Sequence, residues 1–243
     1  MTAESDPTTS ANAEIHHEHR DVTGGWLRPT VFGAMDGLVS NFALIAGIAA
    51  GSHSNLKSVL LAGFAGLGAG AFSMAAGEYV SVRSQSELAL AEVEVERTEL
   101  ERNPLAEQEE LAQLYEGRGL EPQLAAEVAR QLSKNKDQVL GVHAREELGI
   151  DPGDLPSPWL ASVSSLLSFA VGAFLPLLPY IAGASSLVPT IIVSAVGLFT
   201  AGALVSRVTA RSWWYSGLRQ LLVGAIAGAL TFGLGSLVGA VGV

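Results

Sequence analysis

The sequence predicts an all-α membrane protein in which five transmembrane helices are interrupted, after the second, by a charged helical domain. The main observation is a block from residue 82 to residue 158 that holds 17 of the chain's 24 acidic residues and 8 of its 14 basic residues. The sequence on either side is apolar and rich in glycine. A charge at mid-depth in a bilayer costs roughly 2.5 kcal/mol or more. The block must therefore lie in water, and the flanking runs cross the membrane.

Composition excludes several classes of protein. The chain has 243 residues, a formal net charge of -10 and no cysteine. A net negative charge argues against a nucleic-acid partner, which requires a basic surface. Without cysteine there are no disulfides, thiolate metal sites or cysteine nucleophiles. The polar N-terminus has no short cleavable apolar core, so we expect no signal peptide and a flexible tail over residues 1–28.

The apolar runs are long enough to cross the hydrocarbon core, which takes about 20 helical residues. Pro176 and Pro179 are expected to bend or break the third run, because proline removes a backbone donor. We therefore divide the chain into the tail, two spans within 29–82, a domain over 83–151, a proline-rich linker over 152–158, and three spans within 159–243. The individual spans are expected at about 29–50, 57–82, 159–181, 186–206 and 217–240.

The acidic domain is expected to be entirely helical. Pro104 and Pro122 occupy positions suited to the first turn of a helix, and Gly117 and Gly119 separate the two helices that these prolines begin. The predicted helices cover about 83–102, 104–117, 121–133 and 135–149.

The basic residues decide the orientation. With five spans, 13 of the 14 lysines and arginines fall on the side of the N-terminus and the acidic domain, and Lys57 alone falls on the other. The positive-inside rule therefore places the acidic domain in the cytosol. Trp213, Trp214 and Tyr215, beside Arg211, are expected to anchor the same face at the interface.

The carboxylates of the domain are spaced for a hard divalent cation. Glu92, Glu96 and Glu99 share one helical face at i, i+4 and i+7, where like charges repel unless a cation binds them. A solvated acidic helix without a ligand is the other interpretation of this spacing. The tail's His16, His17 and His19 are weaker candidate ligands. Further acidic patches comprise Glu107, Glu109 and Glu110, then Glu146 and Glu147.

Two acids, Asp36 and Glu78, lie inside predicted spans, where an ionisable group is expensive and marks a pathway. Met74 precedes Glu78 by four residues and shares its helical face. Two carboxylates and a thioether suit Fe²⁺ or Mn²⁺ better than Cu⁺ or Ca²⁺, although Zn²⁺ and Co²⁺ remain open. Protons compete with metal for the same oxygens, which is a physical route to antiport.

Two of these segments carry a family resemblance. Residues 36–44, DGLVSNFAL, and 70–79, GAFSMAAGEY, resemble the vacuolar iron transporter family. The order of two spans, an acidic cytosolic domain and three spans is similar too, and the similarity runs from about residue 16 to the end. We interpret the chain as a bacterial-type member, integral to the bacterial inner membrane.

The resemblance implies export of Fe²⁺, often also Mn²⁺, from the cytosol by proton antiport, in a homodimer whose paired first helices line the path through the lipid bilayer. His143 and Ala144 stand where family members place methionines, and imidazole can replace a thioether as a ligand. No cofactor is expected besides the transported or regulatory metal. The implied metal residues are Asp36, Met74 and Glu78 in the membrane, and Glu96, Glu99, Glu107, Glu110 and Glu147 in the domain, with His143 added.

Two other classes of function compete with transport. A di-iron enzyme requires two Glu-x-x-His motifs. Here the order near 143–147 is His-x-x-Glu, with no second copy, so we expect no enzyme. A membrane-anchored metal buffer or sensor needs no carboxylate inside the membrane, so Asp36 and Glu78 argue against it.

Overall fold

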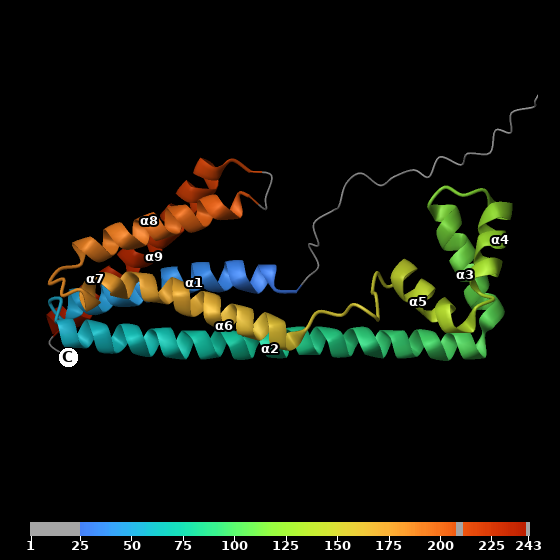
Figure 1. Ribbon diagram of the computed structural model, residues 1–243, viewed down its shortest axis with the longest axis horizontal. Helices are drawn as coiled ribbons and strands as arrows, with labels where there is room; N and C mark the ends of the chain where they lie inside the picture. Colours follow the sequence, from blue (N-terminus) through green and yellow to red (C-terminus); the bar gives the residue numbers. More distant parts are fainter. Residues whose placement is uncertain (1–24, 208–210, 242–243) are drawn as a thin grey trace, which may run out of the picture.

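The computed structural model describes residues 25–207 and 211–241, apart from the side chains of residues 136 and 137. The candidate ligands His16, His17 and His19 lie outside this range. Within it the chain is helical and has no strand (Figure 1). The helices are α1 (Leu27–Gly51), α2 (Leu56–Arg102), α3 (Pro104–Gly117), α4 (Pro122–Leu132), α5 (Lys136–Glu146), α6 (Pro158–Phe174), the 3₁₀ turn η1 (Leu175–Leu177), α7 (Leu178–Ile181), α8 (Val188–Val205) and α9 (Trp213–Val241).

Among the described residues, five helical segments are long and apolar enough to cross a membrane: Leu27–Gly51, Leu56–Arg102, Pro158–Ile181, Val188–Val205 and Trp213–Val241. The predicted number of spans is confirmed. The third span is also broken at its two prolines, as predicted. Helix α6 ends at Phe174, and the chain continues through η1 into α7. The aromatic residues Trp213, Trp214 and Tyr215 form the exposed first turn of α9.

Helix α2 runs along most of the molecule (Figure 1). Its 47 residues span about 70 Å at 1.5 Å per residue. The sequence suggested a span ending near Val82 and a separate domain helix from residue 83, but the two are one continuous helix. No glycine or proline occurs between Glu78 and Asn103, so nothing in this stretch interrupts the backbone hydrogen bonds.

The membrane helices pack around α1, which contacts α2, α6, α8 and α9. Glycine makes two of these contacts possible. A Cβ on Gly172 of α6 would lie 2.1 Å from the carbonyl oxygen of Ala34, and one on Gly235 of α9 would lie 2.0 Å from that of Gly47. The backbones of α1, α6 and α9 therefore touch directly, as small residues allow in membranes.

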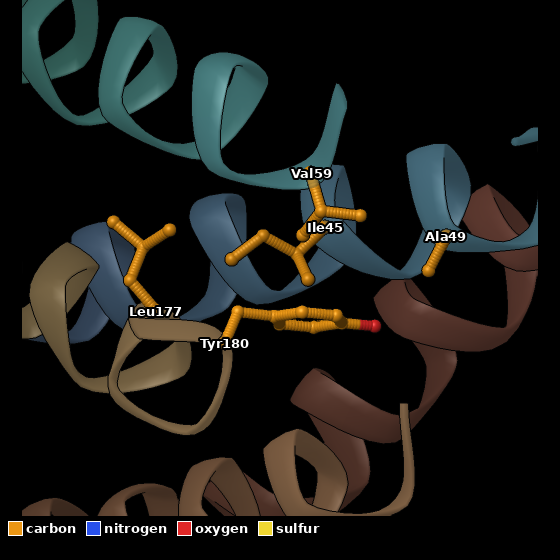
Figure 2. Packing of buried hydrophobic residues seen from close by; sticks show 5 residues of the cluster. All are labelled: Ile45, Ala49, Val59, Leu177 and Tyr180. Carbon is orange, nitrogen blue, oxygen red and sulfur yellow. The ribbon is translucent and has the colours of Figure 1, made fainter. Parts of the chain in front are cut away.

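The end of the bundle farthest from α3, α4 and α5 is closed by an apolar cluster (Figure 2). Ile45 and Ala49 of α1, Val59 of α2, Leu177 of η1 and Tyr180 of α7 are almost completely buried there. Figure 2 shows the Tyr180 ring lying across from Ile45, with its hydroxyl on the side of Ala49. The break in the third span thus brings Leu177 and Tyr180 against α1.

Helices α3, α4 and α5 gather at the other end of α2 (Figure 1). They have a small core of their own, formed by the buried Leu111, Ala112 and Ala129. Their bounds agree with the predicted helices to within about three residues. This core holds α3 against α4 and leaves the inner faces of α3 and α5 directed at the last turns of α2.

Candidate metal centre

Four side chains from three helical segments meet beyond the membrane-spanning part of α2. Glu96, Glu107, His143 and Glu147 each offer a ligand atom, and these atoms all lie within 4.8 Å of one another. We call these four residues the acid–imidazole cluster. Nδ1 of His143 lies 2.7 Å from Oε1 of Glu147, 3.0 Å from Oε1 of Glu96 and 3.9 Å from Oε2 of Glu107. This is the separation expected of atoms that surround one cation.

Local structure brings each of the four side chains to this point. Pro104 begins α3, which places Glu107 in the first turn of that helix, close to the end of α2. His143 lies in the last turn of α5. Glu147 follows that helix, and its amide donates to the His143 carbonyl at 2.8 Å. His143 and Glu147 are thus one turn apart and share a face, as i, i+4 residues do.

An ion pair outside the cluster fixes α5 against α3. Arg118, just after α3, pairs with the carboxylate of Glu146 and also donates to the Glu146 backbone carbonyl at 3.2 Å. The Tyr115 hydroxyl donates to Glu146 Oε1 at 3.2 Å. Neighbouring Glu146 and Glu147 therefore have different surroundings, since Glu146 faces this brace and Glu147 faces the cluster.

The cluster is buried, and several of its polar atoms have no hydrogen-bond partner. The His143 side chain is fully buried, and those of Glu96, Glu107 and Glu147 are 12%, 10% and 14% exposed. Glu96 Oε1, Glu147 Oε1 and both His143 ring nitrogens have no hydrogen-bond partner. Buried polar atoms are ordinarily paired, and an unpaired one costs about 1–3 kcal/mol. One divalent cation would satisfy the grouped atoms together, so the donor set fits a metal ion.

The electrostatics favour a positive ligand as well. Burial raises the pKa of Glu96 to about 7, and the nearby Glu147 carboxylate adds to the rise, while His143 opposes it. Burial also raises the pKa of Glu147 to about 7, with Glu110 and Glu107 adding to it. Both carboxyls therefore hold protons more readily than free glutamate does, and a metal ion has to displace those protons.

Other predicted ligands of the domain lie outside the cluster. Glu99 accepts a hydrogen bond from Asn103 at 3.0 Å, on the last turn of α2. Glu110 is exposed on α3, although it is near enough to raise the pKa of Glu147. Glu92 is exposed. The face shared by Glu92, Glu96 and Glu99 thus contributes one member to the cluster, because α3 and α5 cover only part of it. Ala144 is fully buried in the packing between helices.

The membrane residues line an open groove of about 290 Å³ between α1 and α2. Asp36 and Met74 both line it. Ser40, Asn41 and Ser73 line it too, and Phe169 of α6 forms part of its wall. The sequence interpretation did not include these polar residues. Ser40 had a usable signal, because it follows Asp36 by one helical turn, whereas the one signal for Asn41 was its place in the 36–44 motif.

Glu78 lines a second, smaller cavity of about 190 Å³, together with Arg28, Pro29, Gln85 and Pro156. One carboxylate oxygen of Glu78 is buried and has no hydrogen-bond partner. Along α2 this cavity lies between the groove and the acid–imidazole cluster. Asp36 and Glu78 therefore line two neighbouring cavities rather than a single one.

These features define an integral membrane protein with ionisable and thioether groups inside its bundle and a cation-sized cluster outside it. Residues 27–236 match the model of the VIT family. The chain is 43% identical over 226 residues to the vacuolar iron transporter of Acanthamoeba castellanii, a match that covers 88% of this chain and 79% of that one. Vacuolar iron transporter 1 of Arabidopsis thaliana is 30% identical over 249 residues, covering 98% and 99%. The vacuolar iron transporter of Centaurea cyanus is 32% identical over 225 residues, covering 90% of each.

The chain belongs to the VIT family, as its membrane motifs indicated. The family is one of transporters. These relatives come from an amoeba and from plants and are named vacuolar. A bacterial-type member in a bacterial inner membrane therefore stays a prediction.

Proposed function

We propose that this protein transports iron, moving Fe²⁺ and also Mn²⁺ out of the cytosol in exchange for protons. The observation that carries the proposal is the groove in which Asp36 and Met74 lie together within the membrane bundle. A carboxylate and a thioether form a donor set of intermediate softness, which suits these ions. The curated relatives named as vacuolar iron transporters support the choice of metal.

The acid–imidazole cluster gathers ions for this groove. Glu96 and Glu78 lie on the same uninterrupted helix, about 27 Å apart along its axis at 1.5 Å per residue. An ion released from the cluster meets the cavity of Glu78 and Arg28 before it reaches Asp36. The cytosolic placement of the cluster follows from the distribution of lysines and arginines.

Proton coupling follows from competition at the same oxygens. A carboxylate inside a membrane bundle binds either a proton or a metal ion, because a bare charge there is expensive. A metal ion that leaves Asp36 or Glu78 on the far side frees that oxygen for a proton. The proton then travels in the opposite direction and is displaced by the next ion.

A second copy of the chain covers the groove in this proposal. Ser40 and Ser73 are exposed beside Asp36, so in a single chain a row of polar groups faces out of the bundle. Polar groups at this depth are expected to face protein or water rather than lipid. A homodimer that pairs the two grooves would enclose them. Cross-linking in native membranes across cysteines introduced at Ser40 is the direct measurement.

Metal uptake into proteoliposomes tests the function. The wild type should accumulate Mn²⁺ or Fe²⁺ inside the vesicles when a pH gradient is imposed across their membrane. Asp36→Asn should abolish this flux while the protein still assembles. Asp154→Asn, in the linker, is a control that should leave flux unchanged. Wild-type vesicles that bind metal at the cluster yet move none would instead support the buffer or sensor, because that function needs no path.

A further inference from the structure

Asn41 is an unusual buried polar residue in the membrane bundle. Its side chain is only 2% exposed, and it lies on α1 five residues beyond Asp36, in the wall of the same groove. It lies within the 36–44 motif, but a neutral amide gives no charge signal, and Asn41 is not among the predicted ligands. Its surroundings show what each end of the amide does.

The nitrogen of the Asn41 amide has a hydrogen-bond partner. Nδ2 donates to the carbonyl oxygen of Ala173 at 2.6 Å, in the last turn of α6. Because a carbonyl only accepts, this contact identifies the nitrogen end of the amide and hence the oxygen end. The bond joins α1 to α6 and holds the amide plane in place.

The oxygen of the same amide has no partner and points at the groove. Asn41 Oδ1 is buried without a hydrogen bond. A Cβ placed on Gly66 of α2 would lie 3.0 Å from it, so the oxygen is directed across the groove toward α2. The Leu44 Cδ2 methyl lies closer to the same position, at 2.4 Å, so the absence of a side chain at Gly66 makes room for both Leu44 and Oδ1. An unpaired buried acceptor costs about 1–3 kcal/mol, and a cation in the groove would offset that cost.

We propose that Asn41 is a metal ligand in the membrane groove, its fixed amide oxygen joining Asp36 and Met74 and favouring harder divalent ions over softer ones. This inference rests on the proposed transport function and adds a specificity-determining residue to it. Carbonyl oxygens suit Mn²⁺, whereas thioethers favour softer ions such as Zn²⁺. The balance between one neutral oxygen and one sulfur would thus set the preference of the groove.

The variants Asn41→Leu and Asn41→Met form a matched pair for the test. Both lose the amide oxygen and the hydrogen bond to Ala173, and they have similar volumes. They differ in that methionine brings a thioether. If Asn41 only braces α1 against α6, the two variants must behave alike toward every metal. If it is a ligand, they must differ in metal preference.

Binding is measured on the full-length protein with the acid–imidazole cluster removed by Glu96→Gln, Glu107→Gln, His143→Gln and Glu147→Gln. Mn²⁺ is followed by its electron paramagnetic resonance signal, and Zn²⁺ by competition with it. We expect Asn41→Leu to weaken both metals, Mn²⁺ by about tenfold. Asn41→Met should weaken Mn²⁺ similarly but retain Zn²⁺, so that the ratio of the two affinities shifts by about tenfold. Thr190→Val, at a buried and unpaired residue away from this groove, should leave both affinities unchanged.

Equal losses for both metals in the two variants would overturn the inference, and so would a groove that binds no Mn²⁺ in the cluster-free protein. Proteoliposome flux is measured separately on the same variants with the cluster intact. If substitutions at Asn41 shift the metal-binding preference but the protein moves no metal in proteoliposomes, the transport function is refuted and the ligand assignment stands. The two failures are therefore distinguishable.

Discussion

Nδ1 of His143 lies 2.7 Å from Oε1 of Glu147, one helical turn away, at the distance of an ion pair but without the geometry of a hydrogen bond. Two further carboxylates, Glu96 and Glu107, approach the same nitrogen. Three acids around one imidazole repel each other unless protons or a cation neutralise them. Metal binding and protonation at this cluster are therefore linked. Substitutions in and around the cluster can show which residues bind the metal and which only support the fold.

Neighbouring Glu146 and Glu147 should respond differently to the same substitution. Glu147→Gln removes a charged oxygen from the cluster and should lower the Mn²⁺ affinity of the purified full-length protein by about tenfold to a hundredfold. Glu146→Gln breaks the ion pair to Arg118 and should lower the unfolding temperature without a comparable loss of affinity. Isothermal titration and thermal unfolding measure the two effects. Equal affinity losses would show that Glu146 also binds metal.

The imidazole of His143 should matter for the choice of metal. His143→Met restores a thioether and removes the nitrogen donor, so affinity for Zn²⁺ relative to Mn²⁺ is expected to change, whereas a merely packed histidine would leave the ratio constant. Competition binding to the full-length protein gives the ratio. His53→Met, in the exposed turn between α1 and α2, is the control. An unchanged ratio in His143→Met would remove His143 from the ligand set.

Metal binding at the cluster should weaken in acid. The pKa of Glu96 and that of Glu147 are both raised to about 7, above the ordinary glutamate value of 4.5. Below pH 7 a metal ion must displace bound protons, and each proton displaced costs up to about tenfold in affinity per pH unit. We expect Mn²⁺ affinity to fall by about tenfold or more from pH 8 to pH 6. The fall should be smaller in Glu147→Gln, and a flat profile in the wild type would contradict the prediction.

In the metal-free protein, the contribution of these two groups to stability should fall as the pH rises, whereas metal affinity rises with pH. Because their pKa values are raised on folding, their contribution to the free energy of unfolding is fully present below about pH 4.5 and is lost as the pH rises through about 7. Thermal unfolding of the wild type and of Glu96→Gln over this pH range, both with a chelator present, measures this contribution.

Coupling to protons should depend on Glu78. Glu78→Gln keeps the size of the side chain but removes its titrating charge at the cavity shared with Arg28. We expect lower Mn²⁺ uptake into proteoliposomes and a weaker dependence of uptake on the imposed pH difference. Initial rates at several pH differences decide the matter. Lower flux with an unchanged proportional response would make Glu78 a ligand or a packing residue, and coupling would then rest on Asp36.

The contact between α1 and α6 should tolerate no side chain at Gly172. Gly172→Ala places a Cβ 2.1 Å from the Ala34 carbonyl oxygen, so the helices must separate, at a cost of about 1–3 kcal/mol. Gly233→Ala on α9, where the described structure has no atom within 4 Å of the added Cβ, is the control. Thermal unfolding in detergent should show a lower transition temperature for Gly172→Ala alone. Equal transition temperatures would mean that the two helices separate at no cost.

The sequence alone determined the architecture, because hydrophobic length and charge are properties of local segments. Residues 82–158 cannot lie in lipid, the apolar runs are long enough to span it, and Pro176 and Pro179 interrupt the third run. The same reasoning found Asp36 and Glu78, since a charge within an apolar run is visible without a structure. The family resemblance, rather than charge or hydrophobic length, placed His143 among the candidate ligands.

The tertiary structure decided which of these residues meet. Helical spacing put Glu92, Glu96 and Glu99 on one face, but the angle at which α3 and α5 cross α2 brings Glu96 alone into the acid–imidazole cluster. Likewise the groove unites Asp36 with Met74 and Asn41, while Glu78 lines a neighbouring cavity. Periodicity fixes the face on which a side chain lies, whereas its partners depend on how the helices pack, and that packing rests on contacts such as Gly172 against Ala34 that no local pattern encodes.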